Sequence, residues 1–346
     1  MSVRNNLAGV ISEKGMRGAV QLGDNWLRAE GQATVDPVYL GEVPLSRETA
    51  LWAVARAQGV PTPTVVAQGT LSGSGQRYVL TDNLPGVSWN KFMADQDHQL
   101  GPYLASMRSL GETVARAHRH QFETYGDAFG ASDVRSSVPN FATRLREITA
   151  RRLANAESKQ GAFSDTELAE VTAYFERETA ALEPSLNPGT VPSVLAVTNL
   201  HNTNFLVHPA SGRVTGVPDM KFSQAGPAAI DVYYAMLQQG GYFNQDVLAQ
   251  ARSAFMEGYN KVGNYNPEDG VTTRLEHLLA MSHTLVCVPA YFNADCSDGV
   301  PRQTWSGGFK RLLMQGVEEG PDSYGALPIG WTTILRTKTN QPEQPN

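Results

Sequence analysis

The segment between residues 197 and 219 constrains the fold of this chain more than any other part. It reads Val-Thr-Asn-Leu-His-Asn-Thr-Asn-Phe-Leu-Val from residue 197 and Gly-Val-Pro-Asp from residue 216. Asn204 opens a short apolar strand, and Asp219 ends the next one. Amide and carboxylate oxygens are ligands of the hard kind that Mg²⁺ prefers. The pattern therefore predicts a small hairpin that carries two metal-capable groups.

Bulk properties exclude several classes of protein. The chain has 346 residues, 41% of them hydrophobic and 18% charged, which predicts about two domains with a full core. The net charge of −6, with no basic cluster, argues against nucleic-acid binding. No apolar run approaches the roughly 20 residues that span a bilayer, and the N-terminus lacks the apolar segment of a signal peptide. Cys287 and Cys296 are too few for a disulfide framework. We expect a cytoplasmic protein with no membrane partner.

Strand patterns dominate the first part of the chain and helical patterns the rest. Residues 19–22 and 26–29 flank a tight turn and predict a β-hairpin. A helix with Ser46 as N-cap should stop before Gly59, and strands should follow at residues 64–67 and 77–81. Apolar residues recur at helical spacing after Leu100. The expected helices cover residues 100–120, 138–183 (one or two helices), 228–240, 246–262 and 271–288, and the tail after Gly330 should be frayed.

The 197–219 segment resembles the catalytic and metal-binding hairpin of the aminoglycoside phosphotransferase family, whose members usually read His-Gly-Asp-Leu-His-x-x-Asn and then Asp. In this chain Val197, Thr198 and Asn199 stand at the His-Gly-Asp positions. The resemblance implies an α+β, two-lobed protein-kinase-like fold. Residues 1–83 would form a small, β-rich, nucleotide-binding lobe. Residues 84–346 would form a larger, mainly helical lobe for catalysis and substrate binding, with ATP between the lobes.

The same resemblance assigns roles around the cofactors. Asn204 and Asp219 would hold Mg²⁺ on ATP, with the other metal positions left to phosphate and water. Arg28 would hold the ATP phosphates where related kinases usually have Lys, and Arg keeps the charge while adding a planar fork. Glu48, on the following helix, would be the ion-pair partner of Arg28.

Asn199 stands where the family has its catalytic Asp. An amide can hydrogen-bond the acceptor hydroxyl but cannot take its proton. General-base help is worth about 10²–10⁴ in rate, whereas positioning and charge neutralisation dominate phosphoryl transfer. The change should therefore slow the chemistry without necessarily abolishing it. The resemblance makes His201 a support of the catalytic loop and Asp231 a structural link from that loop to the next helix. Lys221 is either an ordinary exposed lysine or a phosphate contact.

These observations lead to one main hypothesis and two alternatives. The chain would be an ATP-dependent phosphotransferase acting on a hydroxyl of a small-molecule alcohol, or of a peptide Ser or Thr, in a natural-product or antibiotic-resistance pathway. The first alternative is a pseudokinase that binds nucleotide or a peptide as the partner of another enzyme. The second is a resistance enzyme inactivated by mutation. The acidic loop Asp295–Asp298 is either a contact for an amine-bearing substrate or a solvated loop.

Overall fold

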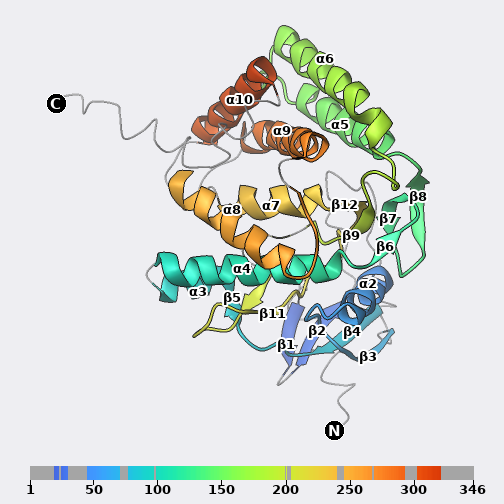
Figure 1. Cartoon of the computed structure of the whole chain (residues 1–346), viewed down its shortest axis with the longest axis vertical. Coiled ribbons are helices and arrows are strands. Elements are labelled where there is room, and N and C mark those ends of the chain that lie inside the picture. The colour runs from blue at the N-terminus through green and yellow to red at the C-terminus, as the bar shows by residue number, and fades with distance from the viewer. Residues whose placement is uncertain are drawn as a thin grey trace, which may run out of the picture.

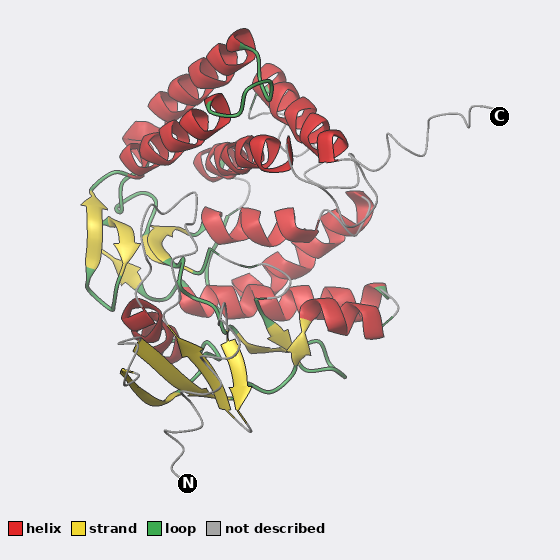
Figure 2. Cartoon of the chain, turned by 180° about the vertical axis from the view of Figure 1, so that it is seen from behind, coloured by secondary structure: helices red, strands yellow, loops and turns green. Residues whose placement is uncertain are grey.

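A computed structural model describes residues 19–22, 25–29, 45–70, 77–96, 99–198, 200, 204–239, 245–266, 269–292 and 302–320. One end of the molecule is a four-stranded sheet with helix α2 beside it, and the opposite end is built from α5, α6, α9 and α10 (Figure 1). Helix α4 crosses the middle of the molecule, and α7 and α8 lie between it and the helical end. Figure 2 shows from behind that the strands gather at one end and along one side. The fold class is α+β, as predicted.

The N-terminal sheet is antiparallel, with the strand order β1-β2-β4-β3. Its strands are β1 (Ala19–Leu22), β2 (Asn25–Ala29), β3 (Val65–Thr70) and β4 (Arg77–Asp82). The predicted hairpin and the two later strands are confirmed. Helix α2 (Leu45–Ala57) packs beside the sheet and buries Leu51 and Trp52 completely. The expectation that Ser46 caps this helix is wrong, because Ser46 lies inside the first turn; serine marks a helix start only to within a residue or two.

A short connection carries the chain from the sheet into the helical part. The chain bends at Gly86, whose φ of 115° favours glycine and whose added Cβ would lie 2.4 Å from Thr215 Oγ1. Strand β5 (Val87–Ser88) and helix α3 (Trp89–Asp95) follow, and the Ser88 side chain caps α3. The boundary between lobes at residue 83 stays a prediction.

Helices α4 (Leu100–Ala117) and α8 (Gln245–Asn260) approach each other through two glycines. A Cβ on Gly111 would lie 2.0 Å from the Phe255 carbonyl oxygen, and one on Gly258 would lie 1.8 Å from the Arg108 carbonyl oxygen. Any larger residue at either position would push the two backbones apart. The remaining helical elements are α5 (Phe141–Glu157), α6 (Asp165–Leu182), η1 (Glu183–Ser185), α7 (Ala229–Gln239), α9 (Gly270–Phe292) and α10 (Arg302–Glu319). The predicted helical regions are thus confirmed, with 138–183 divided into two helices.

Two further sheets lie beside α4. One has three strands in the order β11-β10-β5, and the other has five in the order β6-β9-β12-β7-β8. Their strands are β6 (Gln121–Phe122), β7 (Tyr125–Ala128), β8 (Val134–Val138), β9 (Ser193–Ala196), β10 (Leu206–Val207), β11 (Val214–Gly216) and β12 (Gln224–Pro227). Strands β9, β10, β11 and β12 all come from the part of the sequence that contains the predicted site.

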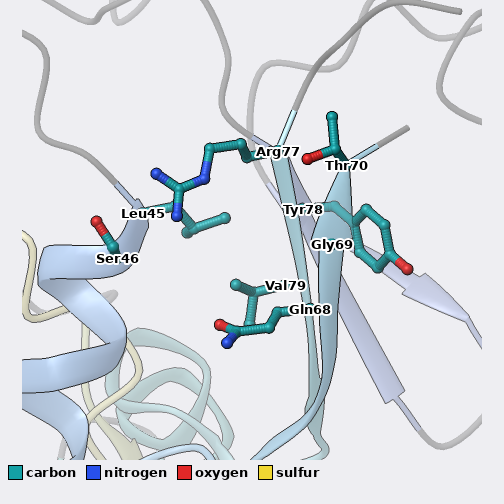
Figure 3. Close-up of a pocket in the computed structure, with 8 residues that line it drawn as sticks. All are labelled: Leu45, Ser46, Gln68, Gly69, Thr70, Arg77, Tyr78 and Val79. Carbon is teal, nitrogen blue, oxygen red and sulfur yellow. The ribbon is translucent and has the colours of Figure 1, made fainter. Parts of the chain in front are cut away.

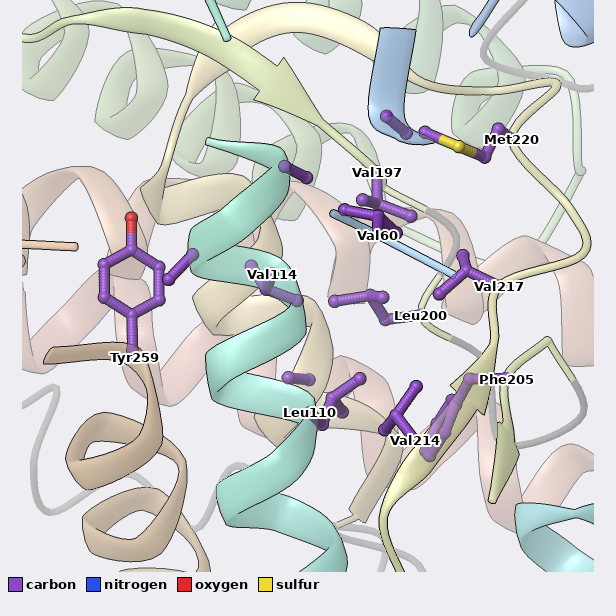
Figure 4. Close-up of a cluster of buried hydrophobic side chains, with 14 of the residues drawn as sticks. Val60, Leu110, Val114, Val197, Leu200, Phe205, Val214, Val217, Met220 and Tyr259 are labelled. Atoms are coloured by element: carbon purple, nitrogen blue, oxygen red, sulfur yellow. The ribbon is translucent and has the colours of Figure 1, made fainter. Parts of the chain in front are cut away.

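Buried side chains form two hydrophobic clusters. The first joins α2, α3, α4 and α8 to the segment with the predicted site, and the second lies among α5, α6, α7, α9 and α10. Figure 4 shows Leu110 and Val114 of α4 pointing toward Leu200, Val214 and Val217. The segment around the predicted site therefore rests on the rigid surface of α4. None of the helices in the described part of the chain combines the length and the apolar character needed to cross a bilayer.

Candidate active site

The predicted hairpin forms, and it brings its two metal-capable residues to the same end. Strands β10 and β11 pair antiparallel, with Leu206 opposite Gly216. Asn204 lies two residues before Leu206, and Asp219 lies three residues after Gly216. Because the partners run in opposite directions, the chain that enters β10 and the chain that leaves β11 lie side by side. Strand β10 also pairs with β5, so the hairpin is joined to the connection between the N-terminal sheet and the helical part.

Asp231 holds the backbone just before residue 199. Its carboxylate is completely buried on α7 and accepts hydrogen bonds from the backbone N–H of Val197 at 2.7 Å and of Thr198 at 2.6 Å. His118, at the end of α4, places its Nε2 2.9 Å from the same carboxylate, and its Nδ1 lies 2.7 Å from the Tyr259 hydroxyl. Asp231 is therefore structural, as predicted, and it connects this backbone to α4, α7 and α8.

Thr198 has a backbone conformation that few residues of its type adopt. Its φ of 63° is left-handed, and the region is unfavourable for β-branched residues. The left-handed conformation costs about 1–2 kcal/mol in a residue other than glycine. Two hydrogen bonds hold it, one from its N–H to Asp231 and one from its Oγ1 to the Phe222 carbonyl at 2.7 Å. Position 198 is a glycine in the pattern that this segment resembles, and the observed φ explains why glycine is favoured there.

Asp219 lies in a loop between β11 and β12 and is paired with a lysine. Its side chain is 14% exposed, its Oδ1 accepts from the Lys221 N–H at 3.2 Å, and its Oδ2 lies 3.4 Å from Lys221 Nζ. Lys221 Nζ also lies 4.7 Å from the centre of the Phe222 ring. The lysine side chain is 36% exposed and lies beside the predicted metal ligand. Its two possible roles, an ordinary exposed lysine or a phosphate contact, stay predictions.

Helix α2 is anchored to the loop that contains Asp219. Arg47 donates from Nη2 to the Ser223 carbonyl and from Nε to the Ala128 carbonyl, both at 2.8 Å. Glu48 Oε1 accepts from the Met220 N–H at 3.2 Å, and Trp52 Nε1 donates to the Pro218 carbonyl at 3.2 Å. All three side chains are buried. These contacts let a helix of the N-terminal region position the backbone on both sides of Asp219.

Sequence reasoning missed Arg47 and Trp52 as parts of the site. Both belong to a helix without a clear amphipathic pattern, and their partners are carbonyl groups far along the chain. Main-chain carbonyls leave no signature in a sequence, so neither contact had a signal that predicts it. Glu48 was predicted to pair with Arg28, and its contact with the Met220 N–H was not foreseen.

Several predicted residues lie outside the described part of the structure. Asn199, His201 and the acidic loop at 295–298 are not among the described residues, and Arg28 is described only in its backbone. The backbone of Arg28 lies in β2 opposite Val79 of β4. Within the described residues, no group of three or more His, Cys, Asp or Glu side chains is arranged to hold a metal ion. The roles assigned to these residues remain predictions.

A separate cavity of about 300 Å³ lies between the N-terminal sheet and the start of α2. Figure 3 shows Arg77 extending from β4 toward Leu45 and Ser46 in the first turn of the helix. The other residues that line it come from β3 and β4, and no predicted site residue is among them. Among the residues whose side chains the structure describes, those that line this cavity include neither Asn204 nor Asp219.

Comparison with known proteins places this geometry in a family. The family model described as APH, phosphotransferase enzyme family, matches residues 40–270, which is most of the chain. The chain belongs to the phosphotransferase enzyme family. No curated protein sequence matches it.

Solved structures show the same fold at low sequence identity. A putative aminoglycoside phosphotransferase from Ralstonia eutropha JMP134 has a TM-score of 0.56 and 10% identity, covering 93% of this chain and 98% of its own. The amicoumacin kinase hAmiN, in complex with AMP-PNP, Ca²⁺ and Ami, has a TM-score of 0.55 and 10% identity, covering 97% of both chains. The GDP complex of aminoglycoside 2'-phosphotransferase-IIIa has a TM-score of 0.53 and 13% identity, covering 92% and 99%. The kinase-like fold predicted from sequence is confirmed.

Proposed function

We propose that this chain is an ATP-dependent phosphotransferase that transfers the γ-phosphoryl group to a hydroxyl. One observation carries the proposal. In a member of the phosphotransferase enzyme family, the β10–β11 hairpin puts Asn204 and Asp219 at one end, beside the backbone that Asp231 holds. Phosphoryl transfer needs metal ligands that lie close to the residue that positions the acceptor hydroxyl.

The chemistry of Asn204 and Asp219 suits Mg²⁺. Both offer oxygen donors, and Mg²⁺ is usually bound by one or two protein ligands together with phosphates and water. The Asp219 side chain is 14% exposed, so its carboxylate is accessible, and the neighbouring Lys221 ammonium already lies beside it as a cation. When bound, Mg²⁺ would neutralise charge on the phosphate oxygens. The chain's own contribution is to hold the two ligands in place through α4, α2 and the hairpin.

The nucleotide would lie between the N-terminal sheet and the hairpin. The backbone of Arg28 in β2 pairs with that of Val79 in β4, and the Val79 side chain is buried in the same cluster as the side chains of α2. This supports the assignment of Arg28 to the ATP phosphates and of Glu48 to the same region. The solved complexes of the amicoumacin kinase with AMP-PNP and Ca²⁺, and of the 2'-phosphotransferase with GDP, support nucleotide and divalent metal in this fold.

The acceptor would be a hydroxyl of a small molecule or of a peptide Ser or Thr, in a natural-product or resistance pathway of the cytoplasm. Asn199 would hydrogen-bond the hydroxyl, and His201 would support the loop. The backbone of Val197 and Thr198 is fixed on Asp231, which supports precise placement of the next residue. With an amide at position 199, catalysis depends on positioning and charge neutralisation.

Two observations favour a second candidate, a pseudokinase that binds nucleotide or a peptide as the partner of another enzyme. Lys221 Nζ lies 3.4 Å from Asp219 Oδ2, and Asn199 replaces the usual carboxylate. The lysine neutralises the carboxylate of the predicted metal ligand, and the amide at position 199 replaces a second carboxylate. Both features reduce the negative charge at the predicted catalytic and metal-binding positions. A protein whose metal ligand is already neutralised can still bind nucleotide through cationic contacts.

Calorimetric titration with ATP, with and without Mg²⁺, tests the proposal. We expect binding that strengthens with Mg²⁺, and Asp219→Ala should remove most of this Mg²⁺-dependent part. Asp133→Ala is the matched control, because Asp133 is 54% exposed and contacts only an exposed Arg135. The absence of heat and of a thermal shift at millimolar ATP would contradict the proposed function. ATP binding without phosphoryl transfer to any hydroxyl acceptor would favour the pseudokinase.

A further inference from the structure

Arg152 is a buried cation without a described anionic partner. Among the described residues, three arginines are buried, namely Arg47, Arg144 and Arg152. Arg47 donates to two backbone carbonyls, and Arg144 pairs with the Asp127 carboxylate. Arg152 is only 7% exposed, and no described carboxylate pairs with it. Burying a guanidinium without a counter-charge is costly, so an anion that reached Arg152 would be held favourably there.

One edge of the Arg152 guanidinium has no described acceptor. Arg152 extends from α5, and its Nη1 donates to Ser282 Oγ of α9 at 2.7 Å. Its Nε–H is buried and has no hydrogen-bond acceptor among the described residues. A carboxylate engages an arginine through two parallel hydrogen bonds, and the edge that includes Nε is one of the two edges suited to this.

The three titratable side chains that the structure describes next to Arg152 add no negative charge near neutral pH. Burial, followed by the nearby Arg152 charge, lowers the pKa of His283 to about 3. Burial raises the pKa of the Cys287 thiol to about 12 and that of the Tyr233 hydroxyl well above its ordinary value. All three side chains are therefore uncharged at pH 7. In the cluster that they form with Arg152, the guanidinium carries the formal charge.

Two aromatic side chains of the cluster are partly exposed. Ser282, Tyr233 and Cys287 are buried, whereas Tyr234 and His283 are half-buried. The Tyr234 and His283 rings meet edge-to-face, with centroids 5.2 Å apart. The Tyr234 and His283 rings thus form a partly exposed aromatic rim of the cluster, contributed by α7 and α9. Small binding sites commonly combine such aromatic side chains with one charged group.

This cluster lies near the backbone that supports the proposed acceptor site. Tyr234 follows Asp231 by three residues, which is about one turn of α7. Residues three apart lie on neighbouring positions of a helix surface. Asp231 in turn holds Val197 and Thr198. A ligand that binds over Tyr234 would therefore approach the loop that contains Asn199.

We propose that Arg152, with Ser282 at its side and the Tyr234–His283 rim of the same cluster, binds a carboxylate of the acceptor substrate. The substrate would thus carry both the hydroxyl that is phosphorylated and a carboxylate, as a hydroxy acid or an acidic peptide does. The assignment of this carboxylate to the acceptor rests on the proposed function. The binding of a carboxylate at Arg152 does not.

Thermal unfolding with acetate tests the anion site without any catalytic step. At constant ionic strength, replacing 100 mM chloride with 100 mM acetate should raise the Tm of the wild type by about 2 °C. Acetamide, which has the same shape without the charge, should not. Arg152→Met should lose the acetate response. Arg146→Met is the matched control, because Arg146 lies on the same helix, is 44% exposed and pairs with Glu183; it should keep the response.

Arg152→Lys separates charge from geometry and serves if the methionine variant does not fold. Lysine keeps the positive charge but lacks the planar fork, so most of the acetate response should disappear. An equal acetate response in the wild type and both Arg152 variants would overturn the proposal, and so would an equal response of the wild type to acetate and acetamide. Either result would mean that the Nε–H is satisfied by water.

The acceptor part is tested with ω-hydroxy acids of increasing chain length and their matching amides, with phosphorylated products detected by mass spectrometry. The wild type should prefer at least one acid over its amide by about 10-fold or more in kcat/KM, and Arg152→Met should remove the preference while leaving ATP binding unchanged. Phosphorylation without any preference would overturn the acceptor assignment. If neither acids nor amides are phosphorylated, the result contradicts the kinase proposal, and the acetate response alone decides on the anion site.

Discussion

Replacing Asp231 with asparagine should destabilise the protein by about 3 kcal/mol. The carboxylate accepts from the Val197 N–H through Oδ2 and from the Thr198 N–H through Oδ1, and Oδ2 also lies 2.9 Å from His118 Nε2. Asparagine keeps one acceptor oxygen and turns the other into an NH₂ donor. One buried N–H then faces a donor. Hydrogen bonds to a charged group contribute about 1.5–3 kcal/mol, and a buried unsatisfied donor costs about 1–3 kcal/mol.

Urea unfolding monitored by tryptophan fluorescence would measure this change in the free energy of unfolding. Asp133→Asn is the control, because its side chain is 54% exposed and lies 3.5 Å from an arginine that is itself exposed. Its effect should stay within about 0.5 kcal/mol. A loss below about 1 kcal/mol for Asp231→Asn would refute the reasoning, since it would mean that the two backbone N–H groups do not depend on the carboxylate.

Three further changes have defined outcomes. Asn199→Asp restores a general base, so turnover should rise by about 10²-fold. A level or lower turnover would show that the enzyme works with the amide and that the added charge repels the phosphate. No phosphoryl transfer with either residue would indicate a pseudokinase. Arg47→Met should weaken Mg²⁺-dependent ATP binding in calorimetry, because the contact with the Ser223 carbonyl that holds the Asp219 loop is lost. Arg56→Met, on the same helix but with its contact at Pro63, should not. The pKa of His283 is lowered to about 3, so this side chain stays neutral in the folded protein, whereas the unfolded chain protonates it below about pH 6.5. The free energy of unfolding should therefore fall as the pH drops from 7 to 5. In urea unfolding, His283→Gln should remove up to about 2 kcal/mol of that fall.

Local patterns predicted the elements of this fold well. The alternation around residues 19–29, the glycine and proline punctuation near residue 60 and the helical spacing after Leu100 all predict elements that form. These signals are local, since each depends on neighbours within one or two turns. The start of α2 was misplaced by one residue because a single serine does not distinguish a cap from the first turn. The order of the elements, with Asn and Asp at the ends of one hairpin, also sufficed for the family resemblance, which the family comparison confirmed.

The sequence by itself determined the fold class, the family and the hairpin that carries Asn204 and Asp219, because these follow from residue type and spacing. Only the tertiary structure decided what holds that hairpin and what neutralises its charges. Arg47 finds backbone carbonyls far along the chain, Lys221 lies against Asp219, and Arg152 is buried away from any described carboxylate. A charged residue in a sequence does not say whether its partner is an anion, a carbonyl or a ligand. That choice depends on which surfaces the packed helices bring together, and burial then makes it energetically decisive.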